Sequence, residues 1–125
     1  MKHRKILLID DDEDDQLIFI DAINEVMYGI ECITASNCND GLALLKLSPQ
    51  PDLVFLDINM PLINGFECLK SIKNDPQLNK IPVIIFSTSD NPLDKRNAFK
   101  FGAEKYVTKT SDFKSLKNKL EEILA

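Results

Sequence analysis

The chain has 125 residues, of which 44% are hydrophobic and 28% are charged, and its formal net charge is −5. This length suits one ordinary domain, and the composition is too apolar for a disordered chain. Residues 10–15 are six consecutive acids; once they are set aside, 14 acidic residues remain against 15 basic ones. This balance excludes both a uniformly acidic surface and a strongly basic, nucleic-acid-binding one.

Cysteine content and the N-terminal sequence bear on the cellular compartment. Cys32, Cys38 and Cys68 are odd in number and lack the CxxC or Cys/His spacing of a metal site. We expect reduced thiols in a cytoplasmic protein rather than a disulfide framework. The first apolar run, Ile6–Ile9, is shorter than a signal-peptide core of ~7–15 residues or a membrane span of ~20. We therefore expect no membrane association.

Five short apolar runs alternate with segments of helical periodicity. The runs are rich in β-branched and aromatic residues, and most are apolar on both faces. This pattern is typical of parallel strands that helices cover on both sides. The runs are Ile6–Ile9, Cys32–Ala35, Leu53–Leu56, Val83–Phe86 and Tyr106–Val107.

The helical segments between these runs carry recognisable start and stop signals. The expected signals are Gly29 at the end of the first helix, Asp40 as N-cap of the second, Asn64 as N-cap of the third, Pro92 in the first turn of the fourth, and Thr110 or Ser111 at the start of the fifth. Five β–α units predict an α/β fold with a parallel sheet. Right-handed crossovers favour a flavodoxin-like three-layer sandwich with strand order 2-1-3-4-5 and five helices, in one domain over residues 1–125.

Polar residues directly follow the predicted strands. Asp10 and Asp11 follow the first strand, Asp57 the third and Ser87 the fourth, whereas Lys109 comes just after the fifth. Ligands of open α/β sheets bind outside the carboxyl ends of the strands, at the point where the strand order switches. We therefore expect these five side chains to converge on one edge of the sheet.

The chemistry of this set favours phosphoryl transfer assisted by a metal. Neighbouring carboxylates repel one another unless a cation shares the site, and Mg²⁺ prefers oxygen ligands. A carboxylate can also accept a phosphoryl group, whose charge a lysine and a hydroxyl would then stabilise. Asp57 is the better acceptor because it is the lone acid of its segment, whereas the pair Asp10 and Asp11 suits the metal. We expect residues 12–15 to cap the first helix and complement its dipole.

Four segments together resemble the receiver domain of bacterial two-component response regulators. Residues 57–65 resemble the phosphoacceptor motif of that family and are the most specific element. Residues 6–11 resemble its first strand, 81–87 its fourth strand and 102–109 its fifth strand. The likeness extends over the whole chain, with the four motifs in the family's order and spacing.

The resemblance implies a role for each residue of the predicted site. Asp57 would accept a phosphoryl group from a histidine kinase or a histidine phosphotransfer protein. Asp10, Asp11, Asp57 and the backbone carbonyl of Asn59 would hold Mg²⁺. Lys109 would contact both the phosphoryl group and the acceptor carboxylate.

The resemblance also implies a conformational switch. Ser87 would move toward the phosphoryl group, and Tyr106 would follow by turning inward. This shift would remodel the face of the fourth helix, fifth strand and fifth helix, where a downstream protein would bind. Since the chain ends just after the fifth helix, we expect a stand-alone receiver without a DNA-binding domain, and a signalling switch rather than a metabolic enzyme.

Two positions depart from the family pattern. Thr110 follows Lys109 where the family usually has a proline joined by a cis peptide bond. A cis bond before a non-proline residue costs ~2.5–4 kcal/mol, so we expect either a trans loop or a strained one. The second departure is Thr88, where many members have a smaller residue beside the phosphorylation site.

Three other functions remain open from the sequence. A receiver-like interaction module would signal without phosphorylation. A phosphohydrolase that forms an aspartyl-phosphate would need a second acid, commonly two residues after the nucleophile, where this chain has Asn59. A flavin-binding protein would need a Ser/Thr/Gly-rich phosphate loop after the first strand, where this chain has its six acids.

Overall fold

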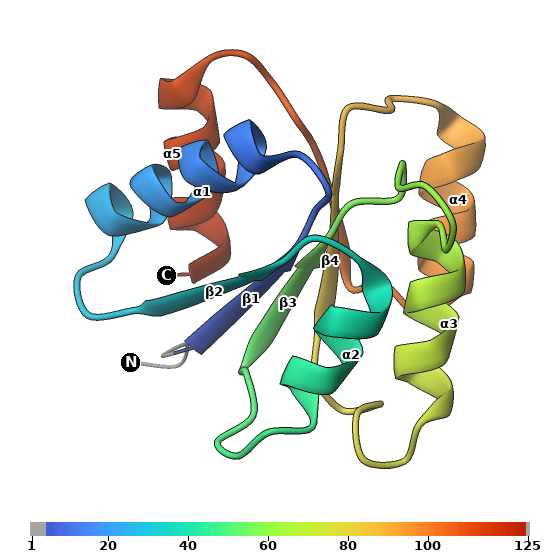
Figure 1. Ribbon diagram of the computed structural model, residues 1–125. Coiled ribbons are helices and arrows are strands. Elements are labelled where there is room, and N and C mark those ends of the chain that lie inside the picture. Colours follow the sequence, from blue (N-terminus) through green and yellow to red (C-terminus); the bar gives the residue numbers. More distant parts are fainter. Residues whose placement is uncertain (1–4, 125) are drawn as a thin grey trace.

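The computed structural model describes residues 5–124, and one parallel sheet organises this part of the chain (Figure 1). Its strands are β1 (Lys5–Ile9), β2 (Glu31–Ala35), β3 (Leu53–Leu56), β4 (Val83–Ser87) and β5 (Lys105–Thr108). They lie in the order β2-β1-β3-β4-β5, and each neighbouring pair is parallel. The predicted strand order is therefore confirmed.

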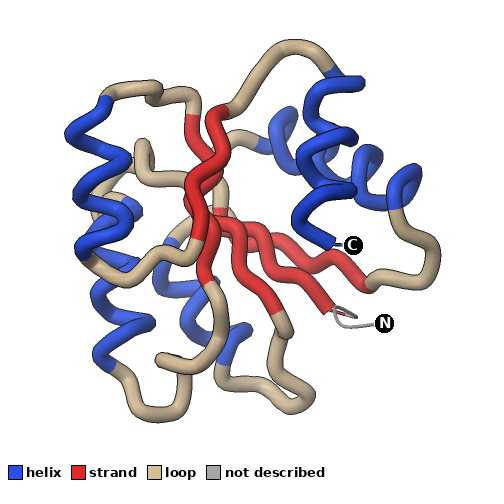
Figure 2. Tube along the Cα trace, turned by 180° about the vertical axis from the view of Figure 1, so that it is seen from behind, coloured by secondary structure: helices blue, strands red, loops and turns tan. Residues whose placement is uncertain are grey.

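Helices cover both faces of this sheet (Figures 1 and 2). They are α1 (Glu13–Val26), α2 (Cys38–Leu45), α3 (Gly65–Asn74), α4 (Pro92–Lys100) and α5 (Phe113–Leu124). Helices α1 and α5 lie on one face, and α2, α3 and α4 lie on the other. This arrangement is the predicted flavodoxin-like sandwich. Within residues 5–124, no helix has both the length and the apolar character needed to cross a lipid bilayer.

Side-chain alternation along β1 divides the core into two parts. Ile6 and Leu8 pack into the core under α1 and α5, whereas Leu7 and Ile9 pack into the core under α2, α3 and α4. All four side chains are fully buried. Because helices cover both faces of this central strand, its residues from Ile6 to Ile9 are all apolar, in a continuous rather than an alternating run.

The starts of α3 and α4 are confirmed, whereas that of α2 differs from prediction. Asn64 caps α3 through its side-chain oxygen, and Pro92 is the first residue of α4. The N-cap of α2 is Asn37, whose Oδ1 accepts a hydrogen bond from the backbone N–H of Asp40 at 2.8 Å. Asp40 therefore lies in the first turn of α2 because Asn37 already supplies the capping oxygen.

Two further helix boundaries differ from prediction. The C-cap of α1 is Met27, and Gly29, with a φ of +87°, lies in the turn that leads to β2. Helix α5 begins after Asp112, whose Oδ1 accepts from the N–H of Lys114 at 3.1 Å, rather than at Thr110 or Ser111. In each case the sequence signal is close to the helix end but does not mark the boundary itself.

The prediction of three reduced thiols is wrong for one pair. Cys38 in α2 and Cys68 in α3 form a disulfide, with 5.7 Å between their Cα atoms. The two cysteines are 30 positions apart in sequence, and only the packing of α2 beside α3 on one face of the sheet brings them together. Cys32 is free, and burial raises the pKa of its thiol to about 12, which keeps it protonated.

Candidate functional site

Asp10 and Asp57 lie side by side at the carboxyl ends of the neighbouring strands β1 and β3. The backbone N–H of Asp10 donates to the carbonyl of Ala35 at 2.9 Å, and that of Asp57 donates to the carbonyl of Ile9 at 3.0 Å. These bonds continue the strand ladders by one residue. The sheet itself therefore fixes the backbone that carries the two carboxylates.

Asp11 completes an acidic cluster with this pair. Oxygen atoms of Asp10, Asp11 and Asp57 all lie within 4.8 Å of one another. Asp10 and Asp57 are buried, whereas Asp11 is exposed. Burial raises the pKa of Asp10, and hydrogen bonds from Lys109 and from the N–H of Asp12 offset only part of this effect. Three convergent carboxylates fit a hard divalent cation such as Mg²⁺, which prefers oxygen ligands.

The ammonium of Lys109 lies among these carboxylates. Its Nζ is 2.7 Å from Oδ2 of Asp10, 2.8 Å from Oδ2 of Asp15 and 3.4 Å from Oδ2 of Asp57. Burial would lower the pKa of Lys109, but the hydrogen bonds to Asp10 and Asp15 and the charges of Asp10 and Asp57 outweigh it and raise that pKa. Lys109 therefore remains a cation at the centre of the site.

The lysine is held by its backbone as well. Its N–H donates to the carbonyl of Ser87 at 2.6 Å, which joins the ends of β4 and β5. Within residues 5–124 the one cis peptide bond is Ser48–Pro49, so the bond between Lys109 and Thr110 is trans. Of the two expectations for this loop, the trans form is the one found. Thr88, the other departure from the family pattern, is exposed.

Asp15 is a member of this site that the sequence reasoning assigned to helix capping. Asp12 is the N-cap of α1, and its Oδ1 accepts from the N–H groups of Asp14 at 2.9 Å and Asp15 at 3.2 Å. Side chains of a helix lean toward its N-terminus, which here faces the edge of the sheet. This direction, applied to the third residue of α1, is the signal that would have placed Asp15 at the site.

The loop after β3 connects Asp57 to Ser87 through Asn59. The N–H of Asn59 donates to Oδ1 of Asp57 at 3.1 Å, and its Nδ2 donates to Oγ of Ser87 at 3.2 Å. Ser87 is fully buried, and its Oγ also accepts from the N–H of Ser89 at 3.2 Å. The hydroxyl of Ser87 is thus part of a hydrogen-bonded path that begins at Asp57.

Gly65, the first residue of α3, allows this helix to begin in close contact with the backbone of Asp57. A Cβ atom at this position would collide with the backbone of Asp57 and Ile58. The N–H of Gly65 donates to the carbonyl of Ile58 at 3.1 Å. The absence of a side chain therefore sets how closely the helix approaches the strand end that carries Asp57.

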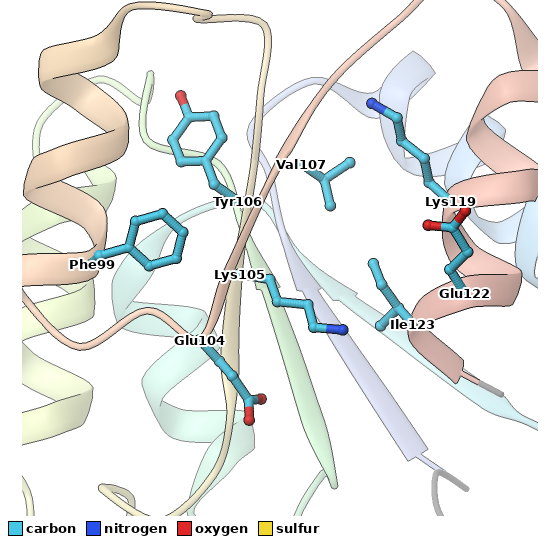
Figure 3. Close-up of a pocket in the computed structure, with 8 residues that line it drawn as sticks. All are labelled: Phe99, Glu104, Lys105, Tyr106, Val107, Lys119, Glu122 and Ile123. Carbon is cyan, nitrogen blue, oxygen red and sulfur yellow. The ribbon is translucent and has the colours of Figure 1, made fainter.

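Tyr106 lies on β5, away from the carboxylates. Its ring is half-buried, and its hydroxyl donates to the carbonyl of Ser89 at 2.8 Å. Figure 3 shows Tyr106 next to Phe99 of α4, with Lys119 and Ile123 of α5 on the other side of β5, and these residues line a hollow. This hollow has a volume of 390 Å³. Ser89 is therefore hydrogen-bonded both to Ser87 at the sheet edge and to Tyr106 on this face.

Similar proteins place this arrangement in a family. Residues 6–121 match the family of the response regulator receiver domain. PilH of Pseudomonas aeruginosa is 35% identical over 119 residues, which cover 95% of this chain and 97% of PilH.

Two solved structures share the fold. The phosphorylated cyanobacterial phytochrome response regulator RcpA is 31% identical, with a TM-score of 0.87 over 97% of this chain and 91% of RcpA. The Mn²⁺-bound form of the response regulator Rcp1 is 29% identical, with a TM-score of 0.84 over 96% of this chain and 91% of Rcp1. The strand order and the matched residues lead to the same assignment: the chain belongs to the response regulator receiver domain family.

Proposed function

We propose that this receiver domain is a Mg²⁺-dependent phosphorelay switch in which Asp57 accepts the phosphoryl group. One observation carries the proposal. Asp57 is 5% exposed, and its carboxylate lies in a cluster with Asp10 and Asp11 and has the ammonium of Lys109 at 3.4 Å. A nucleophile, the ligands for a divalent cation and a fixed positive charge are the groups that phosphoryl transfer needs.

In the proposed transfer, an oxygen of Asp57 attacks the phosphorus of a phosphohistidine on a histidine kinase or phosphotransfer protein. The new O–P bond forms as the N–P bond breaks, and the imidazole keeps the electron pair and takes a proton from water. Lys109 then donates a hydrogen bond to the phosphoryl oxygens. When bound, Mg²⁺ neutralises the charge that accumulates on the oxygens during this step.

Asp10 and Asp11 are the proposed metal ligands, together with Asp57 and the backbone carbonyl of Asn59. The two ligand acids differ in burial, since Asp10 is fully buried and Asp11 is exposed. Mg²⁺ usually keeps several of its waters in proteins. We infer that Asp10 would hold the ion from the buried side of the cluster and Asp11 from the side exposed to solvent.

We further propose that phosphorylation acts on a second protein through the face of α4, β5 and α5, rather than on DNA. The supporting observation is the hydrogen-bonded path from Asp57 through Asn59, Ser87 and Ser89 to Tyr106. A phosphoryl group that draws the Ser87 hydroxyl toward itself removes the acceptor of both Asn59 and the N–H of Ser89. Tyr106, bonded to the same Ser89, is then free to turn.

We treat the protein as a switch rather than a metabolic enzyme, since its product is its own phosphorylated form. The alternative phosphohydrolase would need a second acid two residues after Asp57. In this chain Asn59 is at that position, and its side chain is occupied as a donor to Ser87. The flavin-binding alternative is disfavoured because the acids that follow β1 would repel a phosphate.

The proposal is tested by the intact mass of the protein after incubation with acetyl phosphate and Mg²⁺. We expect the wild type to gain one phosphoryl group and Asp57→Asn to gain none. Asp21→Asn is a matched control, since it removes one charge from the exposed side of α1 and should leave the adduct unchanged. A wild type that binds Mg²⁺ but forms no adduct would support the interaction module instead.

A further inference from the structure

We propose that Asp15 is a positioning residue for the phosphoryl transfer. Its carboxylate holds the ammonium of Lys109 back from Asp57 and competes with the arriving phosphoryl group for that cation. The inference deepens the proposed function and rests on it. It assigns a role to an acid that helix capping does not explain.

Lys109 has as many carboxylates around it as it has donors. A lysine ammonium has three N–H donors and no acceptor. Three carboxylates surround Lys109, namely those of Asp10, Asp15 and Asp57. Each donor therefore already faces a carboxylate, and a phosphoryl oxygen must compete with these carboxylates for Lys109.

The three carboxylates lie at unequal distances from the ammonium of Lys109. The contacts to Asp10 and Asp15 are 2.7 and 2.8 Å, which are short charge-assisted hydrogen bonds. The contact to Asp57 is 3.4 Å, beyond the usual range of ~2.7–3.2 Å for an N–H···O bond. The ammonium is thus drawn toward Asp10 and Asp15 and away from the proposed acceptor.

Of the two carboxylates closest to Lys109, that of Asp15 is the one that can release it. Asp10 is fully buried and is a proposed metal ligand, so its oxygens are committed when the cation is bound. The Asp15 side chain is 32% exposed, so water can take the place of Lys109 there. Breaking the ion pair between Asp15 and Lys109 is therefore the step that lets the ammonium move toward Asp57 and the phosphoryl group.

A role in the helix does not account for Asp15. The capping oxygen of α1 comes from Asp12, and Glu13 and Asp14 supply negative charge in the same first turn. The side chain of Asp14 is exposed and has no contact with Lys109 among the hydrogen bonds and ion pairs of the described residues. Asp14→Asn is thus a matched control for Asp15→Asn, because it removes one charge from the same turn without touching the lysine.

The experiment follows the rate of adduct formation with acetyl phosphate at saturating Mg²⁺, by intact mass, for the wild type and both variants. Both substitutions remove a charge that repels an anionic donor. We expect Asp15→Asn to react roughly two- to fivefold faster than Asp14→Asn, the factor that a partly exposed ion pair supplies. A rate equal to or below that of Asp14→Asn, in a wild type that does form the adduct, would overturn the inference.

A second measurement reports on the ion pair itself. In ¹⁵N-labelled metal-free protein, we expect the ammonium protons of Lys109 to exchange with water faster in Asp15→Asn than in Asp14→Asn or the wild type. Equal exchange in the two variants would contradict the role of Asp15. If instead the wild type forms no adduct at all, the proposed function fails, and this result is distinct from either outcome for Asp15.

Discussion

The carboxyl edge of the sheet and the face of α4, β5 and α5 differ in the groups that they bury and expose. The edge buries polar groups, whereas the face exposes apolar ones. At the edge, Asp10, Ser87 and Lys109 are polar groups removed from water, and each has several hydrogen-bond partners. On the face, Leu93 and Phe99 are apolar side chains that are 54% and 52% exposed. Buried polar groups are costly unless paired, whereas exposed apolar ones are available to another molecule.

This difference gives the two regions separate roles in the proposed function. The edge would accept the phosphoryl group, and the face would bind the partner protein. The edge has fixed geometry and charge, which suit a chemical step. The face has a hollow beside Tyr106 and apolar surface, which suit a protein partner. Ser89 is hydrogen-bonded to Ser87 at the edge and to Tyr106 on the face, and it therefore connects the two regions.

The largest expected effect concerns the disulfide that joins α2 to α3. The disulfide between Cys38 and Cys68 closes a loop of about 30 residues, which corresponds to about 3–4 kcal/mol of stability in the chain-entropy model. We expect the double variant Cys38→Ser/Cys68→Ser to lose about this free energy of unfolding in urea and still to accept a phosphoryl group. Cys32→Ser is the control, and a wild-type stability that does not respond to reductant would contradict the prediction.

The second prediction tests the edge through its metal. At a Mg²⁺ concentration of 100 times Kd, binding adds about 2.7 kcal/mol to the free energy of unfolding. We expect Asp10→Asn to abolish this gain and, without Mg²⁺, to be more stable than the wild type, because it removes a buried charge. Thermal unfolding with and without Mg²⁺ measures both effects.

The same carboxylate makes the edge sensitive to pH. Because burial raises the pKa of Asp10, the folded protein binds this proton more tightly than the unfolded chain does. As pH falls toward the pKa of Asp10, the metal-free wild type should gain stability relative to Asp10→Asn, and its Mg²⁺ affinity should fall. A pH-independent difference between the two proteins would contradict the cost assigned to the buried charge.

A further prediction concerns Gly65, which lies against the backbone of the proposed acceptor Asp57. Gly65→Ala places a Cβ against the backbone of Asp57 and Ile58, and overpacking of this kind costs about 1–3 kcal/mol. We expect lower stability together with slower adduct formation. Gly29→Ala, at a φ of +87° with open space around it, should lower stability without slowing the adduct. Equal rates in the two variants would show that Gly65 does not position Asp57.

The smallest effect is expected on the face. Tyr106→Phe removes the hydrogen bond to the carbonyl of Ser89, which contributes about 0.5–1.5 kcal/mol. We expect this modest loss of stability and an unchanged rate of adduct formation, because Tyr106 does not touch the carboxylates. Tyr28→Phe, at a fully exposed position, is the matched control and should change neither quantity.

The sequence predicts the residues at the carboxyl edge of the sheet better than it predicts the residues that pack around them. The positions of Asp10, Asp57 and Lys109 follow from strand ends, because parallel strands all end at one edge. The strand order follows from the alternation of elements and the handedness of crossovers. Both depend on the course of the backbone, which can be predicted from the order of strands and helices along the sequence.

The features that the sequence analysis missed depend on side-chain direction and on contacts between distant elements. Asp15 belongs to the site because a helical side chain leans back toward the edge of the sheet. Cys38 and Cys68 pair because α2 packs beside α3, which no spacing rule anticipates. Asn37 rather than Asp40 caps α2, because its side-chain oxygen accepts the hydrogen bond from the N–H of Asp40.

The central claim is that phosphorylation of Asp57 changes the face of α4, β5 and α5. Hydrogen exchange followed by mass spectrometry, with acetyl phosphate and Mg²⁺ present or absent, tests it directly. We predict altered exchange both in the loop after β3 and in the segment from Ser89 through β5, and no alteration in Asp57→Asn. A protein that carries the phosphoryl group on Asp57 while the segment from Ser89 through β5 exchanges as before would contradict the claim.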